Sequence, residues 1–432
     1  MYKLNTQNAD FDAAFIKLLG TKRETDEDVT DTVQTIILDV QNRGDDALIE
    51  YTSRLDRFQL TAETLAITLD EVDQAVKACD RDTLNALNLA ADRIMEFHSH
   101  QRPDDLDYTD DAGIRLGYRW TAVDAAGLYV PGGTASYPSS VLMNAIPAKV
   151  AGVRRLVMVV PTPDGKLNPL VLAAAKIAGV DEIYRIGGAQ AIAALAYGTD
   201  TIRPVDKIVG PGNAYVAAAK RQVFGAVGID MIAGPSEILI LADRNSNPDW
   251  VAADLLSQAE HDKAAQSILI TPDGDFAASV EAAIESHLST LSRSDIARTS
   301  WQDFGAIIRV QDLAEAIPLI NQLAPEHLEL AIDNAREFSS NIKNAGAIFL
   351  GHFVPEALGD YLAGPNHVLP TARSARFSSG LGVLDFMKRS SMIECSNDGL
   401  NVVGSAAATL ARAEGLDAHA LSLDIRTNRK SG

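Results

Sequence analysis

The stretch Leu128-Tyr129-Val130-Pro131-Gly132-Gly133 joins a short apolar run to a glycine turn, and a helical stretch follows it. The same order recurs at Ile186-Gly187-Gly188-Ala189-Gln190 and at Ile208-Val209-Gly210-Pro211-Gly212-Asn213. Repeated units of strand, turn and helix predict βαβ connections and a parallel sheet covered by helices. In such a sheet the three turns share one edge, where ligands meet helix N-termini and free backbone N–H groups.

The glycines of these turns have two explanations. Backbone N–H groups at a sheet edge can bind a nucleotide-sized ligand. None of the turns is the dinucleotide fingerprint G-x-G-x-x-G, however, and an ordinary strand-to-helix turn with positive φ also requires glycine. The turns alone leave both explanations open.

The chain around these turns divides into four predicted regions. Residues 1–126 are expected to be helical, because apolar residues recur there at three- and four-residue spacing. We expect this helical region to pack with the second of the two α/β domains that follow it. Residues 127–236 form the first α/β domain. Residues 237–380 form a second Rossmann-like α/β domain, with strand-like runs at 237–241, 267–270, 306–310 and 347–350. Residues 381–432 form a small C-terminal helical arm. The predicted class is α/β with two parallel-sheet domains.

The composition argues against several classes of protein. A formal net charge of −20 argues against nucleic-acid binding, which needs clustered Lys and Arg. No apolar run approaches the roughly 20 residues of a membrane span, so no membrane partner is expected. The first residues lack the pattern of a secretory signal, and we expect a cytoplasmic protein. The two cysteines are too few for a disulfide framework or a cysteine metal cluster.

Two pairs of polar residues in the second half of the chain can carry chemistry. Gln258 and His261 stand three apart on one predicted helical face and can reach one metal ion; alternatively, they are a surface glutamine and a helix-terminal histidine. Glu326 and His327 follow the helix-breaking Pro325. They can transfer protons to and from one substrate, or they are a capping carboxylate beside a core histidine.

Further candidates lie closer to the C-terminus. Asp360 and His367 belong to a glycine-rich stretch typical of functional loops, although Asp is also a common turn former. Glu414 and His419 lie in the tail, where residues are more often solvated than catalytic. Ser236 precedes a predicted strand, whereas the serine of a nucleophile elbow follows a strand. The sequence therefore does not support a serine hydrolase.

Several motifs together resemble the histidinol dehydrogenase family. The most specific is Ile229-Asp230-Met231-Ile232-Ala233-Gly234-Pro235-Ser236-Glu237, with Ile238-Leu239-Ile240-Leu241-Ala242-Asp243 after it. The three glycine turns precede it in the family's order. The motifs that follow it are Leu256-Ser257-Gln258-Ala259-Glu260-His261, Pro325-Glu326-His327, Gly364-Pro365-Asn366-His367 and Phe377-Ser378-Ser379-Gly380-Leu381. The resemblance covers essentially the whole chain.

The resemblance implies an NAD- and zinc-dependent enzyme that oxidises L-histidinol through L-histidinal to L-histidine, the last step of histidine biosynthesis. It implies contacts to NAD from Tyr129, Gln190 and Asn213. It implies one zinc ion per subunit, with the ligands Gln258, His261, Asp360 and His419. It implies a substrate site lined by Ser236, Gln258, His261, His327, Asp360, His367, Glu414 and His419.

The resemblance also assigns the catalytic steps and the assembly. His327 takes the hydroxyl proton and assists the second hydride transfer, and Glu326 activates water to attack the aldehyde. The family is a homodimer in which the tail contributes Glu414 and His419 to the partner's site. One alternative is a related dehydrogenase that oxidises another diol, such as a sulfonated propanediol. Such an enzyme should not need an imidazole-binding site, whereas this sequence keeps His367, Glu414 and His419. The other is a non-catalytic metal- or nucleotide-binding relative, which retention of Glu326 and His327 argues against.

Overall fold

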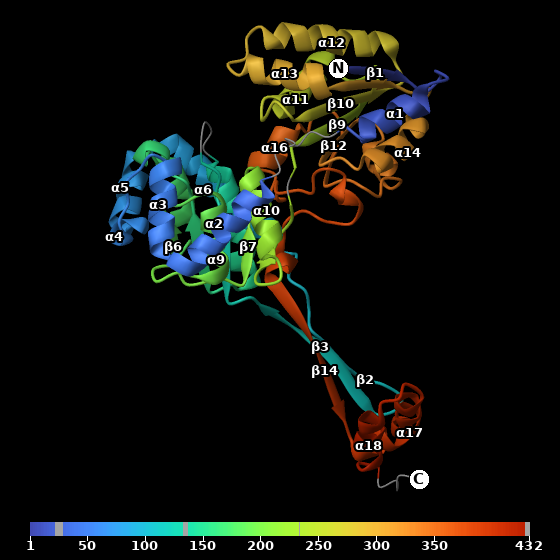
Figure 1. The fold of residues 1–432 in the computed structure, drawn as a ribbon. Helices are drawn as coiled ribbons and strands as arrows, with labels where there is room; N and C mark the ends of the chain where they lie inside the picture. The colour runs from blue at the N-terminus through green and yellow to red at the C-terminus, as the bar shows by residue number, and fades with distance from the viewer. Residues whose placement is uncertain (22–28, 133–136, 233, 428–432) are drawn as a thin grey trace.

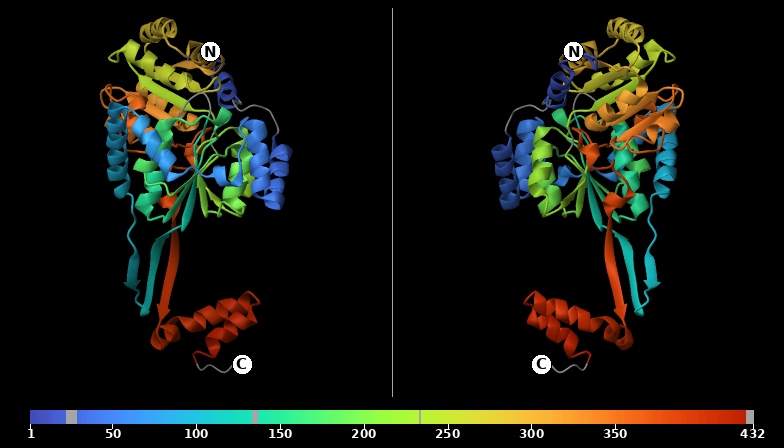
Figure 2. Two further views of the ribbon diagram at one scale, coloured as in Figure 1. Left: turned by 90° about the vertical axis from the view of Figure 1, so that its left-hand side faces the viewer. Right: turned by 90° about the vertical axis from the view of Figure 1, so that its right-hand side faces the viewer.

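The computed structural model describes residues 1–21, 29–132, 137–232 and 234–427. They form two parallel sheets, each covered by helices, and a long antiparallel arm that ends in two helices (Figures 1 and 2). The predicted class, two parallel-sheet domains with a helical C-terminal arm, is confirmed. Gly133, Ala233 and residues 428–432 lie outside the described residues. Among the described residues, no helix has the length and apolar character needed to cross a membrane.

The first sheet carries the three glycine turns. Its strand order is β6-β5-β4-β7-β8, and all its pairs are parallel. The strands are β4 (Ala125–Tyr129), β5 (Arg155–Val159), β6 (Glu182–Tyr184), β7 (Lys207–Val209) and β8 (Gly228–Ile229). The helices are α7 (Pro138–Ala151), α8 (Pro169–Ile177), α9 (Gly188–Tyr197) and α10 (Ala214–Val223), with the 3-10 turn η1 (Pro163–Gly165).

The three glycine turns follow β4, β6 and β7. The strand order reverses between β4 and β7, which is where ligands bind to such sheets.

The helices that precede this sheet are α2 (Thr30–Arg43), α3 (Asp45–Leu55), α4 (Ala62–Leu65), α5 (Leu69–Ala78) and α6 (Arg81–Ser99). They pack on the first sheet's domain, so their expected packing with the second domain is wrong. The buried face of α2, with Val33, Ile37 and Val40, joins the apolar cluster that contains the Ala-rich α9. Among the described elements of this region, β1 (Tyr2–Asn5) and α1 (Phe11–Leu19) join the second sheet and its core instead.

The second sheet has the order β1-β11-β10-β9-β12-β13, again with parallel pairs. Its further strands are β9 (Glu237–Ala242), β10 (Gln266–Thr271), β11 (Ala306–Arg309), β12 (His327–Ala331) and β13 (Ala347–Leu350). Its helices are α11 (Pro248–Ala259), α12 (Gly274–Leu288), α13 (Ser294–Phe304), α14 (Leu313–Leu323), α15 (Ala335–Ser339) and α16 (Glu356–Tyr361). The four predicted runs match β9, β10, β11 and β13. No strand was predicted at β12, because its polar residues His327 and Glu329 interrupt the apolar pattern of a buried strand.

The arm is a three-stranded antiparallel sheet that leads to the last two helices. Its strands are β2 (Leu106–Thr109), β3 (Ile114–Ala122) and β14 (Met387–Cys395), and its helices are α17 (Asn397–Ala413) and α18 (Asp417–Asp424). The 3-10 turns η2 (Ser374–Arg376) and η3 (Val383–Phe386) precede β14 in the chain. Residues 1–126 were predicted to be helical, but they contain β2 and β3. Residues 381–432 were predicted to be a helical tail, but they begin with η3 and the strand β14. The arm extends away from both sheets (Figures 1 and 2).

Candidate active site

Glu326 and His327 stand at the amino end of β12, beside the start of β9. The parallel register places His327 opposite Ile238, so both residues reach the backbone of Glu237. The Glu237 N–H donates to Glu326 Oε2 at 2.9 Å, and His327 Nδ1 lies 2.9 Å from the Glu237 carbonyl oxygen. Both side chains are buried, with 6% and 4% of their residue surface exposed. The neighbouring strand therefore fixes the pair.

The hydrogen bond to Glu237 determines the protonation of His327. A carbonyl oxygen only accepts, so Nδ1 carries the proton and Nε2 keeps its lone pair. Nε2 is buried and has no hydrogen-bond partner among the described residues, and Asp360 Oδ1 lies 3.9 Å from it. Burial lowers the pKa of His327, which favours the neutral ring. His327 is thus a neutral imidazole whose free nitrogen can accept a proton.

Glu326 is the second group whose environment suits proton transfer. Burial raises the pKa of its carboxyl well above the ordinary value, and this outweighs the hydrogen bond from the Glu237 N–H, which lowers it. The carboxylates of Glu237, Glu356 and Asp360 raise the pKa further. A carboxylate with a raised pKa is a stronger base than an exposed one, so Glu326 can take a proton from water.

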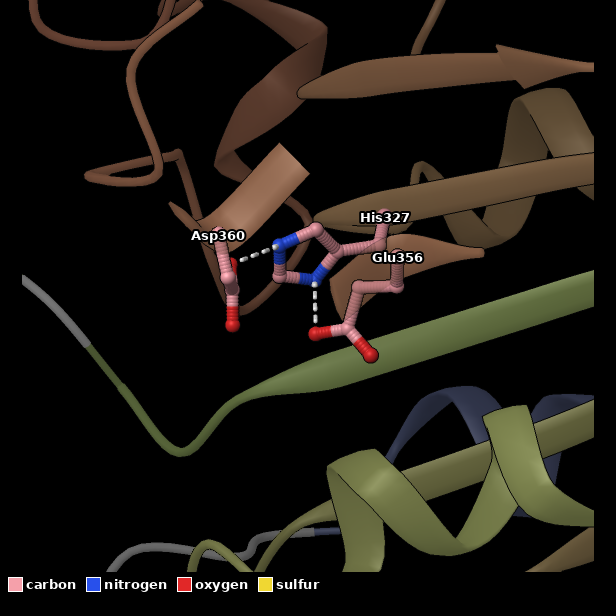
Figure 3. A group of neighbouring side chains, drawn as sticks. All are labelled: His327, Glu356 and Asp360. Carbon is pink, nitrogen blue, oxygen red and sulfur yellow. Dashed lines mark ion pairs between the residues drawn. The ribbon is translucent and has the colours of Figure 1, made fainter. Parts of the chain in front are cut away.

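Helix α16 brings two carboxylates to opposite sides of the His327 ring, as Figure 3 shows. Glu356 Oε1 lies 3.7 Å from Nδ1, and Asp360 Oδ1 lies 3.9 Å from Nε2. One ligand atom from each of the three residues lies within 4.8 Å of the others, a spacing that can hold a metal ion. Glu356 was missed in the sequence, although its spacing of four residues from Asp360 places both on one helical face.

Gln258 and His261 lie together at the end of α11, which ends at Ala259. Gln258 is fully buried, and an atom of its amide lies 3.1 Å from His261 Nδ1. His261 is exposed. The interpretation of Gln258 as a surface residue is therefore wrong, and the two side chains meet as the spacing of three predicted.

His367 connects the two α/β domains at this site. Its Nδ1 donates to the Asp360 carbonyl oxygen at 3.0 Å, which leaves Nε2 to accept from the Ser140 hydroxyl at 3.2 Å. Ser140 belongs to the first turn of α7 and was missed, because no motif singles it out. A cavity of about 610 Å³ opens beside these groups. Its lining includes His327, Asp360, His367, Phe97, Phe349 and Leu369.

Two of the three glycine turns are joined through Tyr129. The Gly188 N–H donates to the Tyr129 hydroxyl at 3.1 Å, and burial raises the pKa of this phenol to about 12. Gln190 is buried, and its Oε1 has no hydrogen-bond partner among the described residues. Asn213 is exposed and caps α10 through the Val216 N–H. The turns thus present a phenol, an orphan amide oxygen and a helix N-terminus at one sheet edge.

The positive-φ explanation of the turns is also correct. Gly188 has φ +65° and Gly210 has φ +111°. A Cβ at Gly210 would lie 2.2 Å from the Tyr129 carbonyl oxygen, so only glycine fits there. Close packing of the turns and ligand binding at their edge are compatible requirements.

Comparison with known proteins shows the family of this chain. The sequence profile of histidinol dehydrogenase matches residues 19–427. This chain belongs to the histidinol dehydrogenase family. Histidinol dehydrogenase of Rhodospirillum rubrum is 64% identical over 99% of both chains, and that of Ruegeria pomeroyi is 62% identical over 99% of both. The crystal structure of histidinol dehydrogenase from Elizabethkingia anophelis has a TM-score of 0.95 at 36% identity, covering 99% of this chain and 98% of its own.

The resemblance drawn from the motifs is therefore confirmed. Membership in the histidinol dehydrogenase family makes the protein an enzyme of the dehydrogenase class and implies a dinucleotide cofactor. The domain boundaries and the roles assigned to single residues stay predictions.

The remaining predicted site residues lie in two places. Ser236 is half-buried and stands immediately before β9, next to the residue that holds Glu326 and His327. Glu414 follows the end of α17 and His419 lies in α18, both exposed. Both helices stand at the far end of the arm (Figure 1). In a single chain Gln258 contacts His261, and Gln258 and Asp360 both lie beside His327, whereas the helix that carries His419 is at the far end of the arm.

Proposed function

We propose that this chain catalyses the NAD-dependent oxidation of L-histidinol through L-histidinal to L-histidine, the last step of histidine biosynthesis. The single observation that supports it most is the lone pair of His327 Nε2, which is buried without a partner among the described residues in a side chain that lines the cavity. Family membership supports the same reaction. The cytoplasmic location expected from the sequence is part of this proposal.

We assign NAD to the edge of the first sheet. The orphan Gln190 Oε1, the Tyr129 hydroxyl and the Asn213 cap fit a polar ligand at the strand-order reversal. NAD, when bound there, supplies the hydride acceptor for both oxidations.

We assign a zinc ion to Gln258, His261 and Asp360, with His419 supplied by the partner's tail. An amide oxygen, an imidazole nitrogen and a carboxylate oxygen are a donor set that suits zinc without a thiolate. When bound, zinc would supply a Lewis acid that orients the substrate.

A metal ion held by His327, Glu356 and Asp360 is less consistent with the geometry. The His327 Nδ1 proton is donated to Glu237, and Glu356 lies on that side of the ring while Asp360 lies on the other (Figure 3). His327 Nε2 therefore stays available for proton transfer.

In the first oxidation His327 acts as the base. Its Nε2 accepts the hydroxyl proton of histidinol as the carbon-bound hydrogen leaves as hydride, and histidinal forms. The Nδ1 bond to Glu237 holds the ring in the required tautomer throughout. His367 and Ser236 line the same substrate site.

In the second oxidation Glu326 takes a proton from water as the water oxygen bonds to the aldehyde carbon. The proton that His327 took in the first oxidation passes to the aldehyde oxygen, so that a neutral hydrate forms and His327 is again a free base. The hydrate then gives a hydroxyl proton to His327 as a second hydride leaves, and histidine forms. Each histidine thus requires one water and two molecules of NAD. Burial of both groups keeps other water from competing for their protons.

We propose a homodimer in which each tail completes the partner's site. The arm carries the exposed Glu414 and His419 far from their own chain's Gln258 and Asp360, which is the arrangement that such an exchange requires (Figures 1 and 2). Dimer exchange is tested by mixing a Glu326→Gln chain with a His419→Ala chain. Restored activity in the mixture supports the exchange, whereas an inactive mixture contradicts it.

The substrate is tested by a panel followed through NADH absorbance. The zinc-loaded protein is expected to oxidise L-histidinol and to leave a sulfonated propanediol and other simple diols unchanged. Faster oxidation of a diol without an imidazole would contradict the proposed function.

A further inference from the structure

The buried amide of Gln258 lies between groups of opposite hydrogen-bonding character. In the orientation in which its oxygen faces His261, its nitrogen lies 3.1 Å from Glu356 Oε1, 3.2 Å from the Glu237 carbonyl oxygen and 3.0 Å from His327 Nδ1. His327 Nδ1 donates its own proton to the Glu237 carbonyl, so the two acceptors for the amide N–H groups are the two oxygens. Its oxygen then lies 3.1 Å from His261 Nδ1. Rotating the amide by half a turn would set its oxygen against two other oxygens, which only accept hydrogen bonds. The surroundings therefore select one of the two orientations.

We propose that Glu356 is a positioning residue that fixes the orientation of the Gln258 amide, so that the amide oxygen points toward His261 and is available to a metal ion. The inference rests on the metal site of the proposed function. It assigns a role to a carboxylate that takes no part in the proton transfers of the reaction.

Glu356 is itself held rigidly. It is 1% exposed, its backbone N–H donates to Glu329 Oε1 at 2.6 Å, and its Oε2 accepts from the Ser257 hydroxyl at 2.9 Å. These bonds leave Oε1 directed at Gln258. A carboxylate fixed in this way can impose an orientation on its neighbour.

The other acceptor near the Gln258 amide nitrogen is weaker. The Glu237 carbonyl oxygen already accepts from His327 Nδ1 at 2.9 Å. The Glu356 carboxyl group accepts its other hydrogen bond, from the Ser257 hydroxyl, on Oε2, which leaves Oε1 for the amide. Glu356 therefore dominates the choice between the two orientations of the amide.

The test replaces the carboxyl group of Glu356 by an amide and keeps the shape of the side chain. In Glu356→Gln the new amide can present either nitrogen or oxygen to Gln258, so the orientation is no longer imposed. Loss of such supporting contacts typically weakens metal binding by about 10- to 100-fold. Zinc affinity is measured on the full chain by competition with a chromophoric chelator. Thermal unfolding of the metal-free protein checks that the variant is folded.

Glu329→Gln is the matched control. Glu329 is a neighbouring carboxylate of similar burial, 3% exposed, and the substitution keeps an oxygen that can accept from the Glu356 N–H. Its zinc affinity is expected to stay within about twofold of the unsubstituted chain, because no hydrogen bond joins it to Gln258 among the described contacts. An equal fall in both variants would overturn the inference, because it would reflect the loss of any buried carboxylate.

The exchange variant Gln258→Glu with Glu356→Gln provides a rescue test. A carboxylate at position 258 offers a metal-binding oxygen in either orientation, and an amide at 356 can donate to it. The pair is expected to bind zinc more tightly than Glu356→Gln alone, and a pair that binds no better would overturn the inference. Unchanged zinc affinity in Glu356→Gln would refute the inference alone, whereas an unsubstituted chain that binds no zinc would refute the metal site itself.

Discussion

Substitution of Glu326 by Gln separates the two oxidations. The amide oxygen of Gln can still accept from the Glu237 N–H, which donates to Glu326 Oε2 at 2.9 Å, so the start of β12 should keep its structure. The group that takes a proton from water is lost. Removal of a general base typically slows a step by about 10²- to 10⁴-fold, or about 3–5 kcal/mol.

The alcohol step should suffer less from Glu326→Gln. His327 keeps its bond to the Glu237 carbonyl, and loss of a carboxylate 3.8 Å from Nδ1 favours the neutral ring that accepts the hydroxyl proton. We expect oxidation of histidinol to fall by less than about tenfold. The assay compares single-turnover NADH formation from histidinol and from histidinal, with wild type as the control. Equal losses in the two steps would refute the assignment of Glu326.

Three further predictions concern other parts of the molecule. His327→Gln should slow both oxidations by about 10²- to 10⁴-fold. It should also remove the fall of kcat/KM at acidic pH, because the neutral form of His327 is the active one and burial lowers the pKa of this ring. An unchanged pH profile would contradict the role of His327. His419→Ala should weaken zinc retention during dialysis without lowering the melting temperature of the metal-free protein, and wild-type retention would exclude His419 as a ligand. Asp230→Asn should lower the free energy of unfolding by about 3–5 kcal/mol, because the Lys220 ammonium, whose side chain is 3% exposed, then stays buried without its charged partner. Urea unfolding measures this change. A change below about 1 kcal/mol would show that the fold does not need the ion pair for its stability.

The sequence predicted the features that depend on local order. The three turns could be placed from strand, glycine and helix in succession, and the structure places them after β4, β6 and β7. The spacing of Gln258 and His261 predicted their contact, because three residues bring side chains together near a helix end.

Features set by contacts between distant segments could not be predicted. Nothing local to residues 387–395 or 114–122 indicates that they pair as antiparallel strands of one arm. Glu356 approaches His327 only because α16 packs beside β12, and Ser140 meets His367 across more than two hundred residues. The place of His419 is set by a second chain in our proposal, so neither one sequence nor one chain's structure determines it.

The most direct test of the central claim counts the cofactor consumed. Zinc-loaded protein is mixed without oxygen with L-histidinol and excess NAD, and NADH is measured by absorbance and histidine by chromatography. The account predicts two NADH for each histidine, because His327 serves two hydride transfers and Glu326 supplies the water between them. One NADH for each molecule of substrate, with histidinal as the product and no histidine, would contradict it.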